Sequence, residues 1–354
     1  MIKYVPILKS KQGEFIALRE LKTETKANIL PLLEIIPIQI DYNNAVPKKT
    51  LETHTADIIK NLAKSWPANL PIYIDTLLLN SGRNGIFHVY EQLDNSGLRY
   101  IPVINVEEHH NCLDVLKSVV ERTNNGFCLR LSNGFITNAN LKNEILEIIG
   151  SYDASIGNID LIIDLGDIST AQLDFYKFAI TMQINMVDIF NQFRRVIIAA
   201  GSVPQDLSAV SSGTEALLQR KEWDFWKEIT SNKNAKHFLY SDYGTNNKAL
   251  NEADPRMMRI GAAIRYTIEE SFYILKGFAI NNPAYDGFGQ FHELSNRLRK
   301  LDLFSGSSFS WGDNYIYFCG QRLNGPGNKT TWVAISTNHH IELVNAQLSN
   351  LPVF

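Results

Sequence analysis

Short apolar runs alternate along the chain with longer amphipathic segments. The runs are rich in branched and aromatic residues, which is typical of strands, and the segments between them have the pattern of helices. Strands are predicted over residues 4–9, 29–34, 71–75, 100–105, 127–131, 159–164, 195–201 and 237–242. Helices are predicted over residues 14–29, 51–66, 85–95, 113–123, 140–149, 169–190 and 214–229.

This alternation predicts an α/β fold, a (β/α)8 TIM-like barrel with an inserted β-hairpin and a C-terminal helical elaboration. The strands are apolar almost throughout, as expected of parallel strands that are buried on both faces. Eight strand–helix units favour a closed barrel over an open sheet. An open doubly wound sheet is the alternative, and it is weakened because no GxGxxG motif follows the first strand.

The pattern changes after the eighth strand. Two β segments at 260–266 and 271–278 predict a hairpin inserted between the last strand and its helix, which is placed at 291–301. A glycine-rich stretch then precedes an amphipathic helix over 331–348. We therefore divide a single domain into three parts: the barrel strands and their helices at 1–244, the hairpin over the barrel mouth at 245–285, and the last barrel helix with the C-terminal elaboration at 286–354. A separate C-terminal domain is the alternative.

Composition is that of an ordinary globular protein: 354 residues, of which 45% are hydrophobic and 20% charged, with a formal net charge of −3. This balance argues against a surface built wholly to bind nucleic-acid phosphates, but it is compatible with a local basic pocket. No signal peptide and no apolar run of about 18 residues is present, so we expect a cytoplasmic protein without a membrane segment. The three cysteines form no CxxC pair and are expected to be free thiols.

Every predicted strand has a polar or ionisable residue at its C-terminal end or directly next to it. In a barrel of this class the C-terminal ends of the strands meet on one face, and that face carries the active site. The strand-end residues are Lys9, Glu34, Asp75, Asn105, Arg130, Asp164, Ser202 and Asp242. We therefore expect a ligand or active site at this face.

The charges in this ring suggest roles in phosphoester chemistry. Arg130 offers a planar fork for phosphate, and Lys9 offers a point charge or a tuned base. Glu34, Asp75 and Asp164 are candidates for a general base or for ligands of Mg²⁺ or Mn²⁺. No HxH or DxD spacing fixes a metal geometry, and the alternative is that Lys9 with Glu34, or Arg130 with Asp164, forms ion pairs that plug the barrel end.

Candidate substrate contacts lie around the same face. A loop over 200–204 could present backbone amides and Ser202 to a phosphate, and Asp242 and Tyr243 follow the last strand. The hairpin carries a basic and partly aromatic patch that could close over an anion; the alternative is a solvated basic edge. This patch consists of Arg256, Arg259, Arg265, Tyr266 and Lys276.

Two pairs of adjacent histidines, His109–His110 and His339–His340, do not fit a metal site. Neighbouring side chains point about 100° apart on a helix, so one helix cannot present both to a single ion. We therefore expect surface or helix-capping roles for both pairs. His340 is retained as a candidate proton donor in case the C-terminal helix folds back over the barrel.

Several short motifs resemble the phage beta protein family over nearly the whole chain. They are Tyr4-Val5-Pro6-Ile7-Leu8-Lys9 with Gly13-Glu14 and Ala17-Leu18, Pro31-Leu32-Leu33-Glu34-Ile35, Ile264-Arg265-Tyr266-Thr267, Ser310-Trp311-Gly312-Asp313 and Asn338-His339-His340-Ile341. The resemblance implies a role in phage–host conflict without implying a particular reaction. It directs attention to residues inside these motifs, among them Asp313 and His339. Lys276 departs from the family pattern, in which an arginine is expected.

The favoured hypothesis is an enzyme, a hydrolase of phosphoesters, that acts on a phosphate-bearing substrate such as a nucleotide or nucleic acid in antiphage defence. In this hypothesis Arg265 and Tyr266 close the site. One alternative is a non-catalytic sensor that binds a protein partner from a neighbouring gene, with a structural charged ring. Another is a lyase or aldolase that forms a Schiff base on Lys9. The sequence leaves open a homo-oligomer and whether the C-terminal helix covers its own barrel or that of a neighbour.

Overall fold

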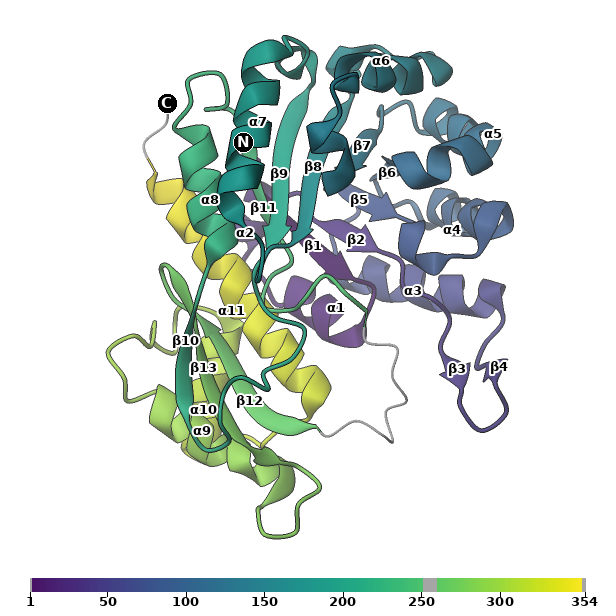
Figure 1. The fold of residues 1–354 in the computed structure, drawn as a ribbon. Helices are drawn as coiled ribbons and strands as arrows, with labels where there is room; N and C mark the ends of the chain where they lie inside the picture. Colours follow the sequence, from purple (N-terminus) through teal and green to yellow (C-terminus); the bar gives the residue numbers. More distant parts are fainter. Residues whose placement is uncertain (1, 251–259, 352–354) are drawn as a thin grey trace.

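A closed barrel of eight parallel strands forms the larger part of the molecule in the computed structural model, which describes residues 2–250 and 260–351 (Figure 1). The strands follow the order β1-β11-β9-β8-β7-β6-β5-β2 around the barrel. Their bounds are Tyr4–Lys9 (β1), Leu32–Glu34 (β2), Ile72–Asp75 (β5), Tyr100–Asn105 (β6), Cys128–Ser132 (β7), Asp160–Asp167 (β8), Arg195–Gly201 (β9) and Leu239–Asp242 (β11). The predicted barrel is confirmed.

Helices surround the barrel as predicted, with some shifted ends. They are α1 (Gln12–Arg19), α2 (Thr23–Asn28), α3 (Leu51–Ser65), α4 (Gly82–Ser96), α5 (Val106–Thr123), α6 (Leu141–Ser151), α7 (Leu173–Met186) and α8 (Lys221–Thr230). The single helix predicted over 14–29 is in fact two helices, α1 and α2. A small hairpin of β3 (Ile40–Asp41) and β4 (Val46–Pro47) was not predicted.

The strands are continuously apolar because each one packs on two cores. Alternate residues such as Val103, Cys128 and Ile197 fill the barrel interior. Their neighbours in sequence, such as Ile104 and Leu129, pack outward against the helices. Since successive strand residues point to opposite faces, two apolar faces produce an unbroken apolar run. All three cysteines are free, as predicted, and all three are buried.

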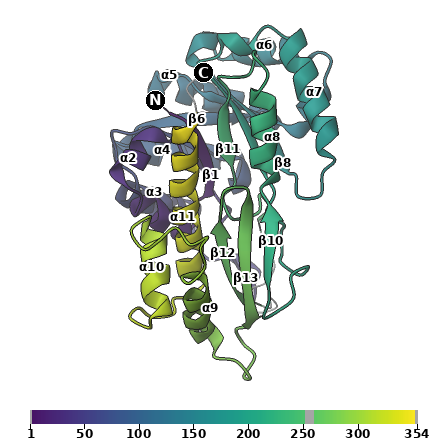
Figure 2. The ribbon, with the colours of Figure 1, turned by 90° about the vertical axis from the view of Figure 1, so that its left-hand side faces the viewer.

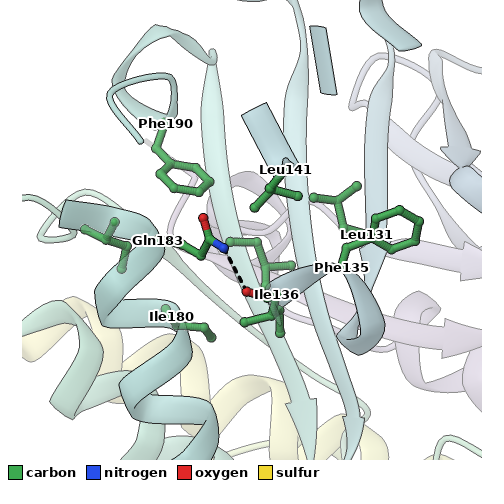
Figure 3. Close-up of a pocket in the computed structure, with 9 residues that line it drawn as sticks. Leu131, Phe135, Ile136, Leu141, Ile180, Gln183 and Phe190 are labelled. Atoms are coloured by element: carbon green, nitrogen blue, oxygen red, sulfur yellow. Dashed lines mark hydrogen bonds between the residues drawn. The ribbon is translucent and has the colours of Figure 1, made fainter. Parts of the chain in front are cut away.

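A small apolar cavity lies beneath α7 and belongs to this outer core (Figure 3). Its volume is about 10 Å³, and its lining includes Phe135, Ile180 and Phe190. The amide of Gln183 donates to the carbonyls of Ile136 and Asn138 and so is already satisfied. A space this small holds at most about one water molecule, so it is a packing defect and no ligand site.

A second, smaller sheet lies beyond the C-terminal ends of the barrel strands (Figures 1 and 2). It contains β10 (Glu215–Gln219), β12 (Gly261–Thr267) and β13 (Ser271–Ala279) in the order β10-β13-β12. The predicted hairpin is confirmed as β12 and β13. The predicted helix over 214–229 is wrong in its first part, because residues 215–219 pair antiparallel with β13. Half-buried and exposed side chains alternate along β10, which is the two-residue period of a strand.

Three helices complete this second unit: α9 (Gln290–Leu298), α10 (Trp311–Gly320) and α11 (Lys329–Asn350). We predicted a last barrel helix over 291–301, but α9 packs against the small sheet through Phe291, Leu294 and Leu298. The last barrel position is taken by α11, whose second half adds Ile341 and Val344 to the outer core of the barrel.

Figure 2 shows α11 running from the barrel to the small sheet. Its first half joins the core of the second unit through Trp332 and Ile335. The C-terminal helix therefore covers its own barrel, and it links the two cores in one rigid element. No helix in the described part of the chain is long and apolar enough to cross a membrane.

Candidate functional site

Arg130 lies at the centre of the barrel mouth and binds three of the predicted acids. Its Nη1 donates to Glu34 at 3.0 Å and to Asp75 at 2.5 Å, and its Nη2 donates to Asp164 at 2.8 Å. Nε also donates to Asp164, and Nη2 also donates to the Tyr243 hydroxyl. We call Glu34, Asp75, Arg130 and Asp164 the mouth ring. The parallel register explains their meeting, because Glu34 and Asp75 are aligned neighbours on β2 and β5.

The mouth ring is electrostatically matched and closed. Burial alone would raise the pKa of Asp164, but Arg130 and then Lys248 hold it well below its usual range. The pKa of Glu34 is raised by its burial, against the opposing effects of Arg130 and Lys9. All five N–H groups of Arg130 are engaged by these residues and Tyr243, so in this geometry the guanidinium has no donor left for a substrate anion.

Residues 244–249 form a strap that covers the mouth ring. Lys248 donates from the strap to Asp164 at 2.9 Å, and Lys9 donates to the carbonyl of Asn247 at 2.9 Å. Asn247 is fixed in turn on the carbonyl of Val203. The ring residues are consequently at most 4% exposed. A ligand reaches the ring only if the strap moves.

A large cleft lies on the other side of the strap, between the barrel mouth and the second unit. Its volume is about 710 Å³, within the range of about 300–1,000 Å³ that is usual for small-molecule sites. Its lining comes from the start of α1, the strap, β12, β13 and the first half of α11. The lining includes charged and aromatic side chains: Lys9, Lys11, Glu14, Arg265, Phe288, Phe291, Lys329 and Trp332.

Among the described residues, five cations line this cleft. We call four of them, Lys9, Lys11, Arg265 and Lys329, the cation cluster; the fifth, Lys276, donates to the carbonyls of Leu207 and Val210. The pKa of Lys329 is lowered by burial and then by the neighbouring charges of Lys11 and Arg265. Burial also lowers the pKa of Lys9, against the opposing effect of Glu34. Among the described residues, no carboxylate forms an ion pair with any of the four. Like charges held this close together repel one another, and a bound anion would relieve the repulsion.

Glu14 also lines the cleft, and the sequence marked it only as part of a family motif. It is 4% exposed, and its Oε2 has no hydrogen-bond partner in the described structure. Burial raises its pKa to about 7, although Lys11 and Lys9 oppose the shift. A carboxyl group that titrates near neutral pH can both give and take a proton. Its place on the buried side of a short amphipathic helix was the feature of the sequence that could have marked Glu14 as a site residue.

Replacing Glu14 with glutamine is expected to stabilise the protein by about 1–3 kcal/mol at pH 8 and by much less at pH 5. An acid with a raised folded-state pKa binds its proton more tightly when folded, so its stability cost is full above pH 7 and disappears towards pH 4.5. Glutamine carries no charge to desolvate at either pH. Urea unfolding of both proteins at the two pH values measures the difference. An equal effect at pH 8 and pH 5 would show that the carboxyl group titrates normally.

Several other predicted site residues lie away from the cleft. Ser202 is buried, accepts the N–H of Lys221 and donates to Glu222, so it anchors the start of α8. Tyr243 contacts the mouth ring: its hydroxyl accepts from Arg130 and donates to Asp164. Arg265 lines the cleft, but Tyr266 points to the opposite face of β12, where it donates to Asp313 and stacks on His339.

Asp242 and His340 form a separate buried pair. Asp242 does not join the other acids, because its side chain points outward from β11 to α11, where His340 lies 2.9 Å away. Asp242 also accepts the hydroxyl of Tyr4 at 2.5 Å. His340 is 0% exposed and contacts Thr267 through its other ring nitrogen, so it cannot reach the cleft in this structure.

The described residues contain no group of three or more His, Cys, Asp or Glu that could hold a metal ion. His339 contacts Asp313 whereas His340 contacts Asp242, so the two rings do face different partners. In the predicted basic patch, Lys276 donates to the carbonyls of Leu207 and Val210. Arg256 and Arg259 lie outside the described residues.

Comparison with known proteins gives a family for this chain and some weak likenesses among solved structures. Solved structures with some likeness include alanine racemase from Clostridium difficile 630 in complex with cycloserine (TM-score 0.33, 9% identity, 75% of this chain and 58% of that chain). The Ignisphaera aggregans GH53 catalytic domain is another (TM-score 0.37, 12% identity, 70% of this chain and 83% of that chain). Thus the chain spans less than two thirds of the racemase.

The likenesses are too weak to bear on activity, and the barrel assignment rests on the strand order itself. No curated protein matches the sequence. The family model described as Beta protein matches residues 4–345, which is nearly the whole chain. As its motifs predict, this chain belongs to the Beta protein family.

Proposed function

We propose that this protein is an enzyme whose active site is the cleft above the strap and whose substrate carries phosphate. The observation that supports the proposal is the cation cluster, in which side chains from β1, β12, α11 and the start of α1 point like charges into one cavity. Folding these residues together costs electrostatic free energy. A phosphate group would offset that cost, because it accepts several charge-assisted hydrogen bonds at once.

The cleft also offers groups for chemistry. Arg265 and the three lysines would neutralise charge that develops on a phosphoryl group, and Glu14 would move a proton to or from the attacking or leaving oxygen. Mg²⁺ or Mn²⁺ would arrive bound to the substrate phosphates, since such ions are commonly held largely by phosphate oxygens and water. The mouth ring lies beneath, and Glu34, Asp75, Arg130 and Asp164 become substrate contacts only when the strap moves.

Calorimetric titration with pyrophosphate tests the anion site. Wild type is expected to bind, and a Lys11→Ala/Lys329→Ala double variant is expected to lose at least about tenfold in affinity, because each charge contributes to holding the anion. Lys117→Ala/Lys142→Ala removes the same charge from surface ion pairs with Asp153 and Asp188 and should bind like wild type. Absence of binding to wild type, or an equal loss in both double variants, would contradict the proposal.

One observation favours a second function, a non-catalytic sensor: each acid of the mouth ring forms an ion pair with Arg130, and the ring is buried. For either function we propose a cytoplasmic role in phage–host conflict, on the basis of the family. Plaque formation on cells that carry wild type or Glu14→Gln separates the two functions. An enzyme is expected to lose its effect on phage in the variant while pyrophosphate affinity is kept. A sensor would keep both.

A further inference from the structure

We propose that the ligand of the cleft is a nucleoside phosphate, with its phosphates on the cation cluster and its base against a wall of aromatic rings. This inference rests on the proposed function, since it names the substrate class of the same site. It adds a second recognition element that inorganic phosphate cannot use.

The aromatic wall consists of Phe288, Phe291 and Trp332, which all line the cleft. The rings of Phe291 and Trp332 stack at 4.2 Å with an interplanar angle of 12°, and Phe288 lies nearly parallel to Phe291 at 17°. Phe291 and Trp332 are buried, whereas Phe288 is half-buried and presents part of its ring. Phe288, with the nearly parallel rings of Phe291 and Trp332 packed behind it, favours a flat ligand group, because any nucleobase can stack on an aromatic ring.

The apolar and basic parts of the cleft are close enough for one small ligand. Lys329 and Trp332 both lie on α11, three residues apart, which is about 4.5 Å along a helix axis. Ile280 also lines the cleft and adds to its apolar part. With a cavity of about 710 Å³, the site fits a single nucleotide better than a nucleic-acid chain. Sugar phosphates lack the flat group that the wall favours.

Competitive titration distinguishes this inference from the proposed function. The probes are inorganic tripolyphosphate, ATP, GTP, CTP, adenosine and a ten-nucleotide single strand. Wild type is expected to bind at least one nucleoside triphosphate about tenfold or more tightly than tripolyphosphate, because stacking adds to the phosphate contacts. Adenosine alone should bind weakly.

Phe288→Leu keeps an apolar side chain but removes the flat ring. In this variant the preference for the triphosphate over tripolyphosphate should fall below about threefold, while the affinity for tripolyphosphate stays unchanged. Phe87→Leu, on the exposed side of α4, is the matched control and should keep the preference. Equal affinity of wild type for tripolyphosphate and all three nucleotides would overturn the nucleotide inference but leave the anion site standing. If no phosphate probe binds, both the nucleotide inference and the anion site are overturned. If the oligonucleotide binds more than tenfold more tightly than any nucleotide, the ligand is a nucleic acid and the proposed ligand class is wrong.

Discussion

Replacing Arg130 with methionine is expected to lower the free energy of unfolding by about 3–5 kcal/mol at pH 8, the usual cost of removing one partner from a buried ion pair. Methionine fills a similar volume, so the loss comes from charge. Glu34, Asp75 and Asp164 would remain in a site that is at most 4% exposed, without the cation that holds them together. Urea unfolding followed by circular dichroism measures the difference.

The loss is expected to be smaller at pH 5. Without Arg130, burial and mutual repulsion raise the folded-state pKa values of the three carboxyl groups above their unfolded values. Acids with raised folded-state pKa values gain stability as the pH falls towards the unfolded values, so the variant recovers on acidification. In wild type the pKa of Asp164 lies below its unfolded value of 3.8, so its stabilising effect persists from pH 8 to pH 5.

Arg195→Met is the matched control for Arg130→Met. It removes a half-buried arginine from the buried carboxylate of Asp160, but Arg194 keeps two bonds to the same group, at 2.8 and 2.6 Å. We expect a cost below about 1 kcal/mol with little change between pH 8 and pH 5. If Arg130→Met lowers the free energy of unfolding no more than Arg195→Met does, and equally at pH 8 and pH 5, the mouth ring is not a coupled charge network.

The meeting of Glu34, Asp75, Arg130 and Asp164 could be predicted because the barrel fold alone brings the ends of parallel strands together. The exception is Asp242. A strand points successive side chains to opposite faces, and an apolar run that is buried on both faces does not reveal which face its last residue takes. The outward direction of Asp242 is settled only by its contact with His340, 98 residues further along the chain.

The cleft could not be predicted for a different reason. The cation cluster comes from residues 9, 11, 265 and 329, and no local pattern links a strand end, two helix starts and a distant hairpin. The strap was not predicted, because tertiary hydrogen bonds hold it in place, among them those of Lys248 with Asp164 and of Lys9 with Asn247. β10 was taken as helix because five residues with a two-residue period precede a true helix without a break. Long-range packing decided each of these features.

The contact between Asp242 and His340 also explains how the two cores of the molecule are held together. α11 contributes to the barrel core and to the core of the small sheet, and His340 lies between these two parts of the helix. Asp242 can only accept hydrogen bonds, so Nε2 of the ring donates to it and Nδ1 accepts the hydroxyl of Thr267 on β12. Burial lowers the pKa of His340, which is consistent with this neutral ring. One side chain thus joins β11, α11 and β12.

Replacing His340 with leucine is therefore expected to cost about 2–4 kcal/mol, because a buried carboxylate loses a hydrogen-bond donor and a buried hydroxyl loses its acceptor. His88→Leu is the control. It removes a half-buried ring on α4 whose nitrogens lie 3.8 Å from Glu52 and Glu91, and it should cost below about 0.5 kcal/mol. Adding Asp242→Asn to His340→Leu should cost less than the sum of the two single changes by at least about 1 kcal/mol, since asparagine removes the charge that was left without its partner. Strict additivity in urea unfolding would show that the two residues act independently and that the cores are joined by apolar packing alone.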